Sequence, residues 1–288
     1  MSNPYLIDRP ALIAFSGGRT SGFMLRQIID AFGGSLPDDV IPTFCNTGLE
    51  HPATLDFVKE CGERWGVNVR WLEYRAGQGG TRAQQIHELV EVDHATASRN
   101  GEPFEQLIDM RTILPNPVSR FCTQDLKARL MDRYVNTFHQ WESHTVAIGL
   151  RYDEPHRALR LRSDRKSIEK VCPMYDARHT LADVNAFWDE QPFRLGIPMH
   201  QGNCQGCFLK SAHRLEMVAR ETPEALERWV RHEAKAAAWG RSAGVLEINT
   251  RFRHDRPGYR VQLEMAKEPT LFCGLPTDDD TMPCDCTD

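Results

Sequence analysis

The chain has 288 residues, of which 41% are hydrophobic and 26% are charged, and its formal net charge is −5. Length and composition predict a globular protein with a full hydrophobic core. The net charge excludes a global positive field that would attract nucleic acid or an anionic membrane. The opening MSNPYLIDRP lacks a signal peptide's basic start and apolar run, and the chain has no uninterrupted run of roughly 18 apolar residues. We therefore expect a cytoplasmic protein that is not associated with a membrane.

Hydrophobic periodicity predicts alternating strands and helices along the first two thirds of the chain. Strands are expected at residues 10–15, 40–45, 67–74 and 144–150, with a short fifth strand just before Cys172. Helices are expected from Thr20 to the Gly33-Gly34 pair, across Leu55, Val58 and Trp65, at about 123–138, and from Pro223 to about Trp239. Residues 75–102 are polar and less regular.

The order of these elements, β-α-β-α-β, predicts an α/β fold whose parallel Rossmann-like sheet has helices on both faces. A ligand site is expected beyond the carboxyl ends of the strands. We expect a nucleotide-binding domain at residues 1–200 and a smaller, mainly helical C-terminal region at 201–288, which ends in the acidic tail TDDDTMPCDCTD.

A glycine-rich turn follows the first predicted strand. Its sequence is SGGRTS, formed by Ser16, Gly17, Gly18, Arg19, Thr20 and Ser21. A strand that passes through such a turn into a helix directs backbone N–H groups and the positive end of the helix dipole at one point, which favours an anion such as phosphate. A plain tight turn is the alternative. We expect a bulky residue at Gly17 to abolish nucleotide binding with little loss of fold.

Three further segments carry polar groups suited to the same ligand. CNTGLEHPATLDF, 45–57, offers Asn46 and Thr47 as hydrogen-bonding groups and Gly48 as room for a nucleotide. SRFCTQDLKARL, 119–130, offers Arg120 and Lys127, with an exposed helix face as the alternative for the lysine. GLRYDEPHR, 149–157, follows a strand at Gly149, and its Arg151 and Arg157 are planar forks for phosphate or sulfate that Glu154 can orient. A solvated charged loop is the alternative there.

The nine cysteines are an odd number, which in a reducing compartment favours metal, cluster or redox chemistry over a disulfide framework. Cys204 and Cys207 form a CxxC, which suits zinc, a dithiol pair or half of an iron–sulfur site. Cys122 and Cys172 supply two further candidate ligands. Cys45 and Cys61 are expected in the core, and Cys284 and Cys286 form a CxC on the tail.

Together these segments resemble the PP-loop superfamily of N-type ATP pyrophosphatases and PAPS reductases. SGGRTS is similar to the SGGxDS loop, with Thr20 at the usual acidic position, and CNTGLEHPA is similar to DTGxxxPET, with Asn46 and Ala53 at usual acidic positions. GLRYDEPHR resembles the GxRxxExxxR signature. The resemblance spans roughly residues 10–215 and implies an adenine nucleotide alpha hydrolase-like sheet that binds ATP, APS or PAPS, with Mg²⁺ as a candidate ion.

The same resemblance implies a cofactor. In APS reductases and DNA-phosphorothioation sulfurtransferases of this superfamily, a [4Fe–4S] cluster is held by cysteines of the middle segment and a downstream CxxC. The corresponding ligands here are Cys122, Cys172, Cys204 and Cys207, and zinc is the alternative ion. Residue types do not separate the two.

Three functions follow from the resemblance. The first is an ATP-dependent enzyme that releases pyrophosphate and transfers sulfur, with a cysteine desulfurase as a candidate donor and Lys127, Arg151, Glu154 and Arg157 as catalytic groups. The second is an APS or PAPS reductase that uses a thioredoxin-like reductant and releases sulfite. The third is a non-catalytic nucleotide-sensing subunit of a nucleic-acid-modifying or defence complex, suggested by the basic stretches at 157–170 and 251–260.

Overall fold

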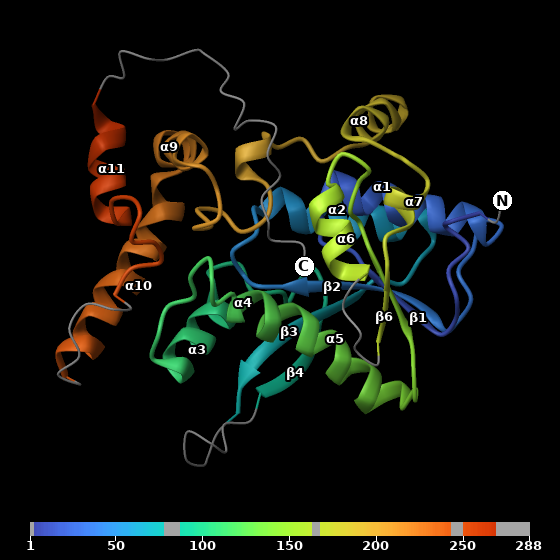
Figure 1. The fold of residues 1–288 in the computed structure, drawn as a ribbon, viewed down its shortest axis with the longest axis horizontal. Helices are drawn as coiled ribbons and strands as arrows, with labels where there is room; N and C mark the ends of the chain where they lie inside the picture. The colour runs from blue at the N-terminus through green and yellow to red at the C-terminus, as the bar shows by residue number, and fades with distance from the viewer. Residues whose placement is uncertain (1–2, 78–86, 163–167, 243–249, 269–288) are drawn as a thin grey trace.

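A six-stranded mixed sheet forms the centre of the protein in a computed structural model that describes residues 3–77, 87–162, 168–242 and 250–268. Its strands are β1 (Ala11–Ala14), β2 (Val40–Asn46), β3 (Arg70–Ala76), β4 (His87–Val92), β5 (Thr145–Ile148) and β6 (Glu169–Val171). Their spatial order is β4-β3-β2-β1-β5-β6 (Figure 1). All neighbours are parallel except β3 and β4, which are antiparallel. The predicted α/β fold class is confirmed.

The chain changes direction across the sheet between β1 and β5. From β1 it builds outward through β2 and β3, and it then returns to place β5 on the other side of β1. In a parallel α/β sheet such a switch point leaves a crevice at the carboxyl ends of the two strands, where no crossover helix covers them. The topology therefore places a crevice directly after Ala14 and Ile148.

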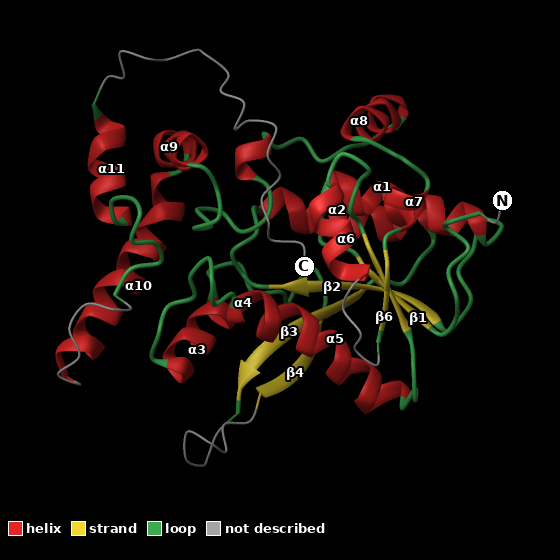
Figure 2. Ribbon diagram, in the orientation of Figure 1, coloured by secondary structure: helices red, strands yellow, loops and turns green. Residues whose placement is uncertain are grey.

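Helices cover both faces of the sheet (Figure 2). The first half of the chain contributes α1 (Arg19–Ala31), α2 (Pro52–Trp65), α3 (Glu102–Arg111), α4 (Phe121–Thr123), the π-helical turn η2 (Gln124–Ala128), α5 (Arg129–Tyr134) and the π-helical turn η3 (Val135–His139). The second half contributes α6 (Pro155–Arg162), α7 (Pro173–Asp176), α8 (Leu181–Glu190), the 3₁₀ turn η4 (Met199–Gln201), α9 (Ala212–Glu221), α10 (Pro223–Ser242) and α11 (Tyr259–Lys267).

Two apolar clusters hold these layers together, one on each face. Leu12 of β1 belongs to the cluster that includes α3 and α5, whereas the adjacent Ile13 belongs to the cluster that includes α1, α2 and α8. Both side chains are fully buried. This alternation follows from the two-residue period of a strand, and it explains why β1 has an apolar side chain on each face.

The C-terminal helices pack on one edge of this core. Phe104 of α3 lies 5.3 Å from the Trp229 ring of α10 and 6.5 Å from the Phe252 ring, so one apolar cluster runs from the sheet to the helical region. The predicted boundary near residue 200 stays a prediction.

Local patterns predicted most of the parallel strands and several helices, with clear exceptions. β4 lies in the stretch expected to be irregular, and α3 begins at the end of that stretch and runs through a segment for which no element was predicted. The expected single helix at 123–138 contains the π-helical turns η2 and η3. The predicted tail cysteines, Cys284 and Cys286, and the basic residues Arg165 and Lys166 lie outside the described residues.

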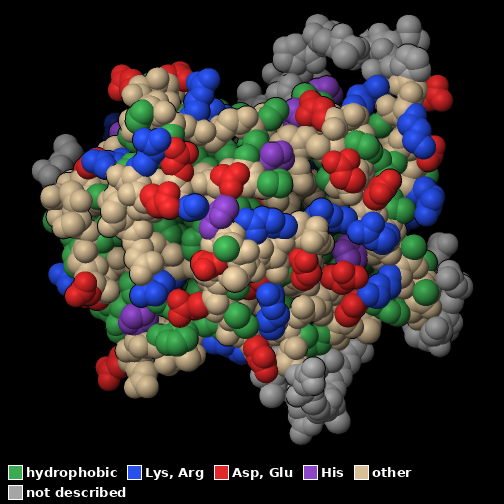
Figure 3. Space-filling model, turned by 180° about the vertical axis from the view of Figure 1, so that it is seen from behind, with side chains coloured by type: hydrophobic (Ala, Val, Ile, Leu, Met, Phe, Trp, Pro, Cys, Tyr) green, Lys and Arg blue, Asp and Glu red, His purple; other side chains and the backbone are tan. Residues whose placement is uncertain are grey.

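The surface mixes both signs of charge. On the face in Figure 3, basic and acidic side chains are interspersed, in keeping with the small net charge. In the described ranges, no helix is both long and apolar enough to cross a membrane.

One buried histidine makes stability depend on pH. His232 of α10 is 7% exposed and packs on Phe104 with ring centroids 5.6 Å apart, and burial lowers its pKa to about 4. Because an unfolded histidine titrates near pH ~6.5, the unfolded chain binds the extra proton as the pH falls. The contribution is fully present above pH ~6.5, and up to about 3 kcal/mol is lost by pH ~4.

We therefore expect His232→Gln to flatten the fall in unfolding free energy between about pH 7 and pH 4, as measured by urea denaturation at each pH. An exposed histidine substituted in the same way, His156→Gln, serves as the control. A wild-type slope that His232→Gln leaves unchanged would contradict this assignment.

Candidate functional site

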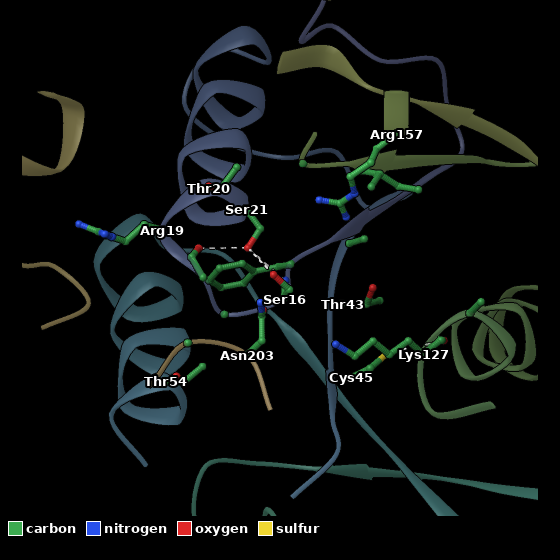
Figure 4. A pocket seen from close by; sticks show the side chains of 18 of the residues that line it. Ser16, Arg19, Thr20, Ser21, Thr43, Cys45, Thr54, Lys127, Arg157 and Asn203 are labelled. Carbon is green, nitrogen blue, oxygen red and sulfur yellow. Dashed lines mark hydrogen bonds between the residues drawn. The ribbon is translucent and has the colours of Figure 1, made fainter. Parts of the chain in front are cut away.

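A cavity of about 390 Å³ opens at the switch point between β1 and β5. Its centre is the loop at residues 16–21 (Figure 4). One wall comes from the η2 and α5 helices and from β5 and β6, and the other comes from residues 195–203 and α9. All four predicted segments therefore border one space, and the segment at 45–57 does so through Cys45 and Thr54.

The loop at residues 16–21 is closed on itself by a serine hydroxyl. Ser21 is 5% exposed, and its Oγ accepts the Ser16 N–H at 3.2 Å and lies 3.0 Å from Ser16 Oγ. The same hydroxyl donates to the Gly18 carbonyl at 3.1 Å. Gly17 has φ +76°, which L side chains rarely adopt. These bonds hold the loop in one shape before any ligand binds.

The helix that follows the loop has an N-terminus suited to an anion. Within the described part of the chain, its N-cap Gly18 makes no side-chain capping hydrogen bond, and its first turn holds no acidic residue. By contrast, His51 caps α2 and Ser211 caps α9 through side-chain acceptors. The first-turn amides of α1 and the positive end of its dipole therefore face the cavity without a protein cap, which favours a bound anion there.

The segment after β5 places two arginines over the loop. Glu154 is 5% exposed, and its carboxylate accepts the Arg151 backbone N–H at 3.2 Å and pairs with both the Arg151 guanidinium, also at 3.2 Å, and that of Arg157. Arg151 Nη1 in turn donates to Thr20 Oγ1 at 3.4 Å. A buried carboxylate that holds two guanidinium groups fixes their orientation. Glu154 thus contacts both arginines, and its role at a functional site stays a prediction.

Gly149 allows the end of β5 to lie close to the start of α1. A Cβ at this position would lie 3.3 Å from the Ser21 Cα, which is tighter than ordinary van der Waals contact. Glycine therefore lets the end of β5 approach the start of α1, and this approach brings Arg151 to Thr20.

Lys127 enters the cavity from the wall that η2 and α5 form. It lies in the π-helical turn η2, and Figure 4 shows its side chain beside Cys45 and Thr43. Cys45 Sγ donates to the Lys127 carbonyl at 3.7 Å, and burial raises the pKa of this thiol to about 12. Cys45 is therefore a neutral thiol near neutral pH, as expected for a core cysteine.

The cavity is lined by an excess of positive charge. Among the described residues that line it, seven are basic and two are acidic: Arg19, Lys127, Arg129, Arg151, Arg157, Lys170 and Arg214 against Asp132 and Glu154. Charges of one sign in a concave site attract a ligand of the other sign. The composition of this wall favours a polyanionic ligand.

Four predicted nucleotide-binding residues are not among the described residues that line the cavity: Asn46, Thr47, Gly48 and Arg120. Asn46 is fully buried and donates to Glu73 at 2.6 Å, and Thr47 donates to Glu50 at 2.8 Å. Gly48 has φ +75° and packs against Gly101. The polar groups of this corner therefore form hydrogen bonds within the protein, and their contact with a nucleotide stays a prediction.

Comparison with known proteins gives a relative in a bacteriophage. The chain is 30% identical over 221 residues to the nin region protein ORF290 of Escherichia phage lambda, which is described as uncharacterized; the match covers 75% of this chain and 71% of that protein. The chain belongs to the ORF290 family. No family model matches it. Among solved structures, the U34-tRNA thiolase NcsA from Methanococcus maripaludis, with its [4Fe–4S] cluster, has a TM-score of 0.42 at 13% identity, with 94% of this chain and 77% of that chain covered. That likeness is too distant to assign a function.

The predicted ligand cysteines of this ORF290-family chain lie on the face of the sheet that also carries α3 and α5. Cys172 and Cys207 are buried, Cys122 and Cys204 are partly exposed, and all four belong to or pack on the same apolar cluster. Cys204 Sγ lies 3.4 Å from Thr47 Oγ1 and 3.9 Å from Glu50 Oε1. Over the ranges that the structure describes, no group of three or more His, Cys, Asp and Glu side chains is arranged to hold a metal ion. A [4Fe–4S] cluster or zinc ion at these cysteines stays a prediction.

Several cavity residues were not predicted from the sequence. Asn203 and Arg214 line the wall from the C-terminal half. Trp188 is not among the described residues that line the cavity, but its indole N–H donates to the Arg19 carbonyl of the loop at 2.8 Å. None lies in a glycine-rich or strand-end motif. The signal for Asn203 is its place immediately before the CxxC, whereas Arg214 and Trp188 reach the site only through tertiary packing.

The expectation that Gly17 tolerates a side chain without loss of fold is wrong. A Cβ there would lie 2.7 Å from Thr54 Cγ2 and 2.9 Å from Val58 Cγ2. At Gly18 the nearest atom to a Cβ is Ser16 Oγ at 3.8 Å. Gly17 is therefore required by packing as well as by its backbone conformation.

We expect Gly17→Ala to destabilise the protein by about 2–4 kcal/mol, because left-handed strain and overpacking add. Gly18→Ala is the matched control and should stay within about 0.5 kcal/mol of wild type. Chemical denaturation measures both. Equal stabilities of the two variants would show that the loop does not adopt this packing.

Proposed function

We propose that the protein is an adenine-nucleotide-binding enzyme that binds ATP at the loop of residues 16–21 and cleaves it between the α and β phosphates, in a reaction coupled to sulfur transfer. The observation that carries this proposal is the uncapped start of α1 inside a cavity with an excess of basic side chains. The resemblance of the same segments to the PP-loop superfamily supports the choice of nucleotide and reaction.

Both backbone and side-chain groups of the cavity would bind a triphosphate. The first-turn amides of α1 and the Ser16 hydroxyl supply short, fixed donors for phosphate oxygens. Arg151 and Arg157, oriented by Glu154, supply planar forks, and Lys127 supplies a point charge from η2. Asp132 and Glu154 are the carboxylates of the wall that would hold Mg²⁺, and the ion would supply positive charge that neutralises the phosphates.

These groups suit displacement at the α phosphorus. An acceptor oxygen attacks that atom, the bond to the bridging oxygen breaks, and pyrophosphate leaves with the electron pair, so the acceptor becomes adenylylated. A sulfur nucleophile such as hydrosulfide then displaces AMP. The protein stabilises the charge that builds on the departing phosphates, and Lys127 and Arg151, which line the cavity, are the groups proposed for this role. Since the four cysteines form no metal-holding group within the described ranges, no step is assigned to a cluster.

Nucleotide preference and product distinguish this proposal from a reductase. We expect calorimetry to show that ATP binds in preference to APS and PAPS, and we expect pyrophosphate to be released from ATP. Lys127→Met should lower that rate by about 10²–10³-fold, because one electrostatic contact to the leaving group is lost. Lys59→Met, a change of a surface lysine on α2, is the control and should leave the rate unchanged.

Two results would reject the proposal. Sulfite release from APS or PAPS, with no pyrophosphate from ATP, would establish the reductase instead. Binding of ATP without turnover, together with salt-sensitive binding of DNA or RNA, would establish a nucleotide-sensing subunit.

A further inference from the structure

Asn203 lines the cavity but has no role in the ATP site proposed above. It comes directly before Cys204 of the CxxC, and Figure 4 shows its side chain beside Ser16 of the loop at residues 16–21. We propose that Asn203 is a further ligand-binding residue, whose carboxamide N–H donates to an oxygen of a phosphate group held by this loop. The inference deepens the proposed function and rests on it for the identity of the ligand, the phosphate chain of a nucleotide.

The backbone of Asn203 is left-handed, with φ +55°. Three other described residues that are not glycine share this conformation, and each lies at a helix end: Thr112 after α3, Gln140 after η3 and Arg178 just beyond α7. Left-handed residues are common there, because they help to satisfy the last carbonyl groups of a helix. The turn η4 instead ends at Gly202, whose backbone is extended. A helix end therefore does not explain the conformation of Asn203, and sparsely populated conformations are concentrated at functional sites.

Contacts of both neighbouring residues hold this backbone in place. The carbonyl of Gly202, directly before Asn203, accepts from Lys210 Nζ at 2.5 Å. Directly after Asn203, Cys204 forms an isolated β-bridge with Glu50. The chain is thus attached to other segments of the protein on each side of Asn203. A side chain on a backbone that is fixed in this way is preorganised, so less conformational entropy is lost when a ligand binds.

A neutral amide suits this place in the wall. Among the described residues that line the cavity, seven are basic and two are acidic, so another cation beside the loop would add repulsion between like charges. A carboxamide donates a hydrogen bond without adding charge, and a bond to an ionised acceptor is stronger than one between neutral groups. Because Asn203 lies beside Ser16, the two side chains can donate to the same phosphate group from different segments.

The test uses inorganic pyrophosphate as the probe for the phosphate loop, and calorimetry measures its affinity for two glycine variants. Asn203→Gly removes the carboxamide and keeps the left-handed backbone, which glycine adopts freely. We expect it to weaken pyrophosphate binding by about 10–100-fold, because one hydrogen bond to a charged group is lost. Gln140→Gly makes the same change at an exposed helix end with φ +53°, and it should bind pyrophosphate as wild type does.

A second variant, Asn203→Asp, separates ligand binding from a structural role of the turn. Aspartate has the shape of asparagine and also tolerates the left-handed region, but its carboxylate donates no hydrogen bond and repels phosphate. Pyrophosphate affinity should therefore fall further than in Asn203→Gly, whereas the urea midpoints of both variants should stay close to that of wild type. A loss of affinity that is accompanied by an equal loss of stability would overturn the proposal, because the residue would then act through the fold.

Turnover of ATP by the same proteins tests the proposed function separately. The inference about Asn203 is overturned if Asn203→Gly binds pyrophosphate as tightly as wild type does, or if wild type binds none. In either case, release of pyrophosphate from ATP by the wild type would leave the proposed function standing. A wild type that releases no pyrophosphate from ATP, but whose affinity for pyrophosphate depends on Asn203, would reject the proposed function and support Asn203 as a phosphate-binding residue.

Discussion

The close approach of β5 to the start of α1 is the constraint on which the site depends. Gly149 has no side chain, and its backbone therefore packs against Ser21. That contact fixes the residue whose hydroxyl closes the loop, and it also sets the distance over which Arg151 reaches Thr20. The first-turn amides of α1 and the guanidinium groups of the segment after β5 therefore face the same cavity. Since both strands are held in register by the parallel sheet, the geometry is carried by the most rigid part of the fold.

Electrostatics explains why this arrangement is stable without a ligand. Several positive groups around an uncapped helix end would repel one another, and Glu154 offsets part of that repulsion by pairing with Arg151 and Arg157. Its burial makes the two contacts stronger than surface ion pairs and keeps both side chains ordered. Asp125 of η2, which is 2% exposed, likewise pairs with Arg111 and with the cavity residue Arg129, each at 2.5 Å. Buried carboxylates therefore set where the cations point.

The parts of the site that the sequence predicts are those with local signals. The first strand, the glycine pair and the following helix are contiguous in sequence. The segment after β5 is also contiguous and carries Gly149, Arg151, Glu154 and Arg157. Because the two strands are parallel neighbours, their carboxyl ends bring the two segments together. The corner at Asn46 has similar local signals, but its polar groups are satisfied by Glu73 and Glu50, which spacing alone does not reveal. The orientation of Lys127 depends on a π-helical turn, and the position of Arg214 depends on the packing of α9. Neither feature follows from a periodic pattern of residues in the sequence. The parts of the site that the sequence does not predict are those that depend on tertiary contacts.

The residues that follow the corner at Asn46 also hold the far wall of the cavity in position. The Leu49 carbonyl accepts the Gln205 N–H at 2.8 Å, and Glu50 and Cys204 form an isolated β-bridge, so the segment that carries Gly202 and Asn203 is attached to the end of β2. The Trp229 indole N–H donates to the Gln205 carbonyl at 2.8 Å from the other side. A segment held between the sheet and α10 has little freedom to move relative to the loop, which is also anchored on the sheet. The distance between this wall and the loop is therefore set by the fold, and fixed alignment of bound groups lowers the entropic part of a reaction barrier.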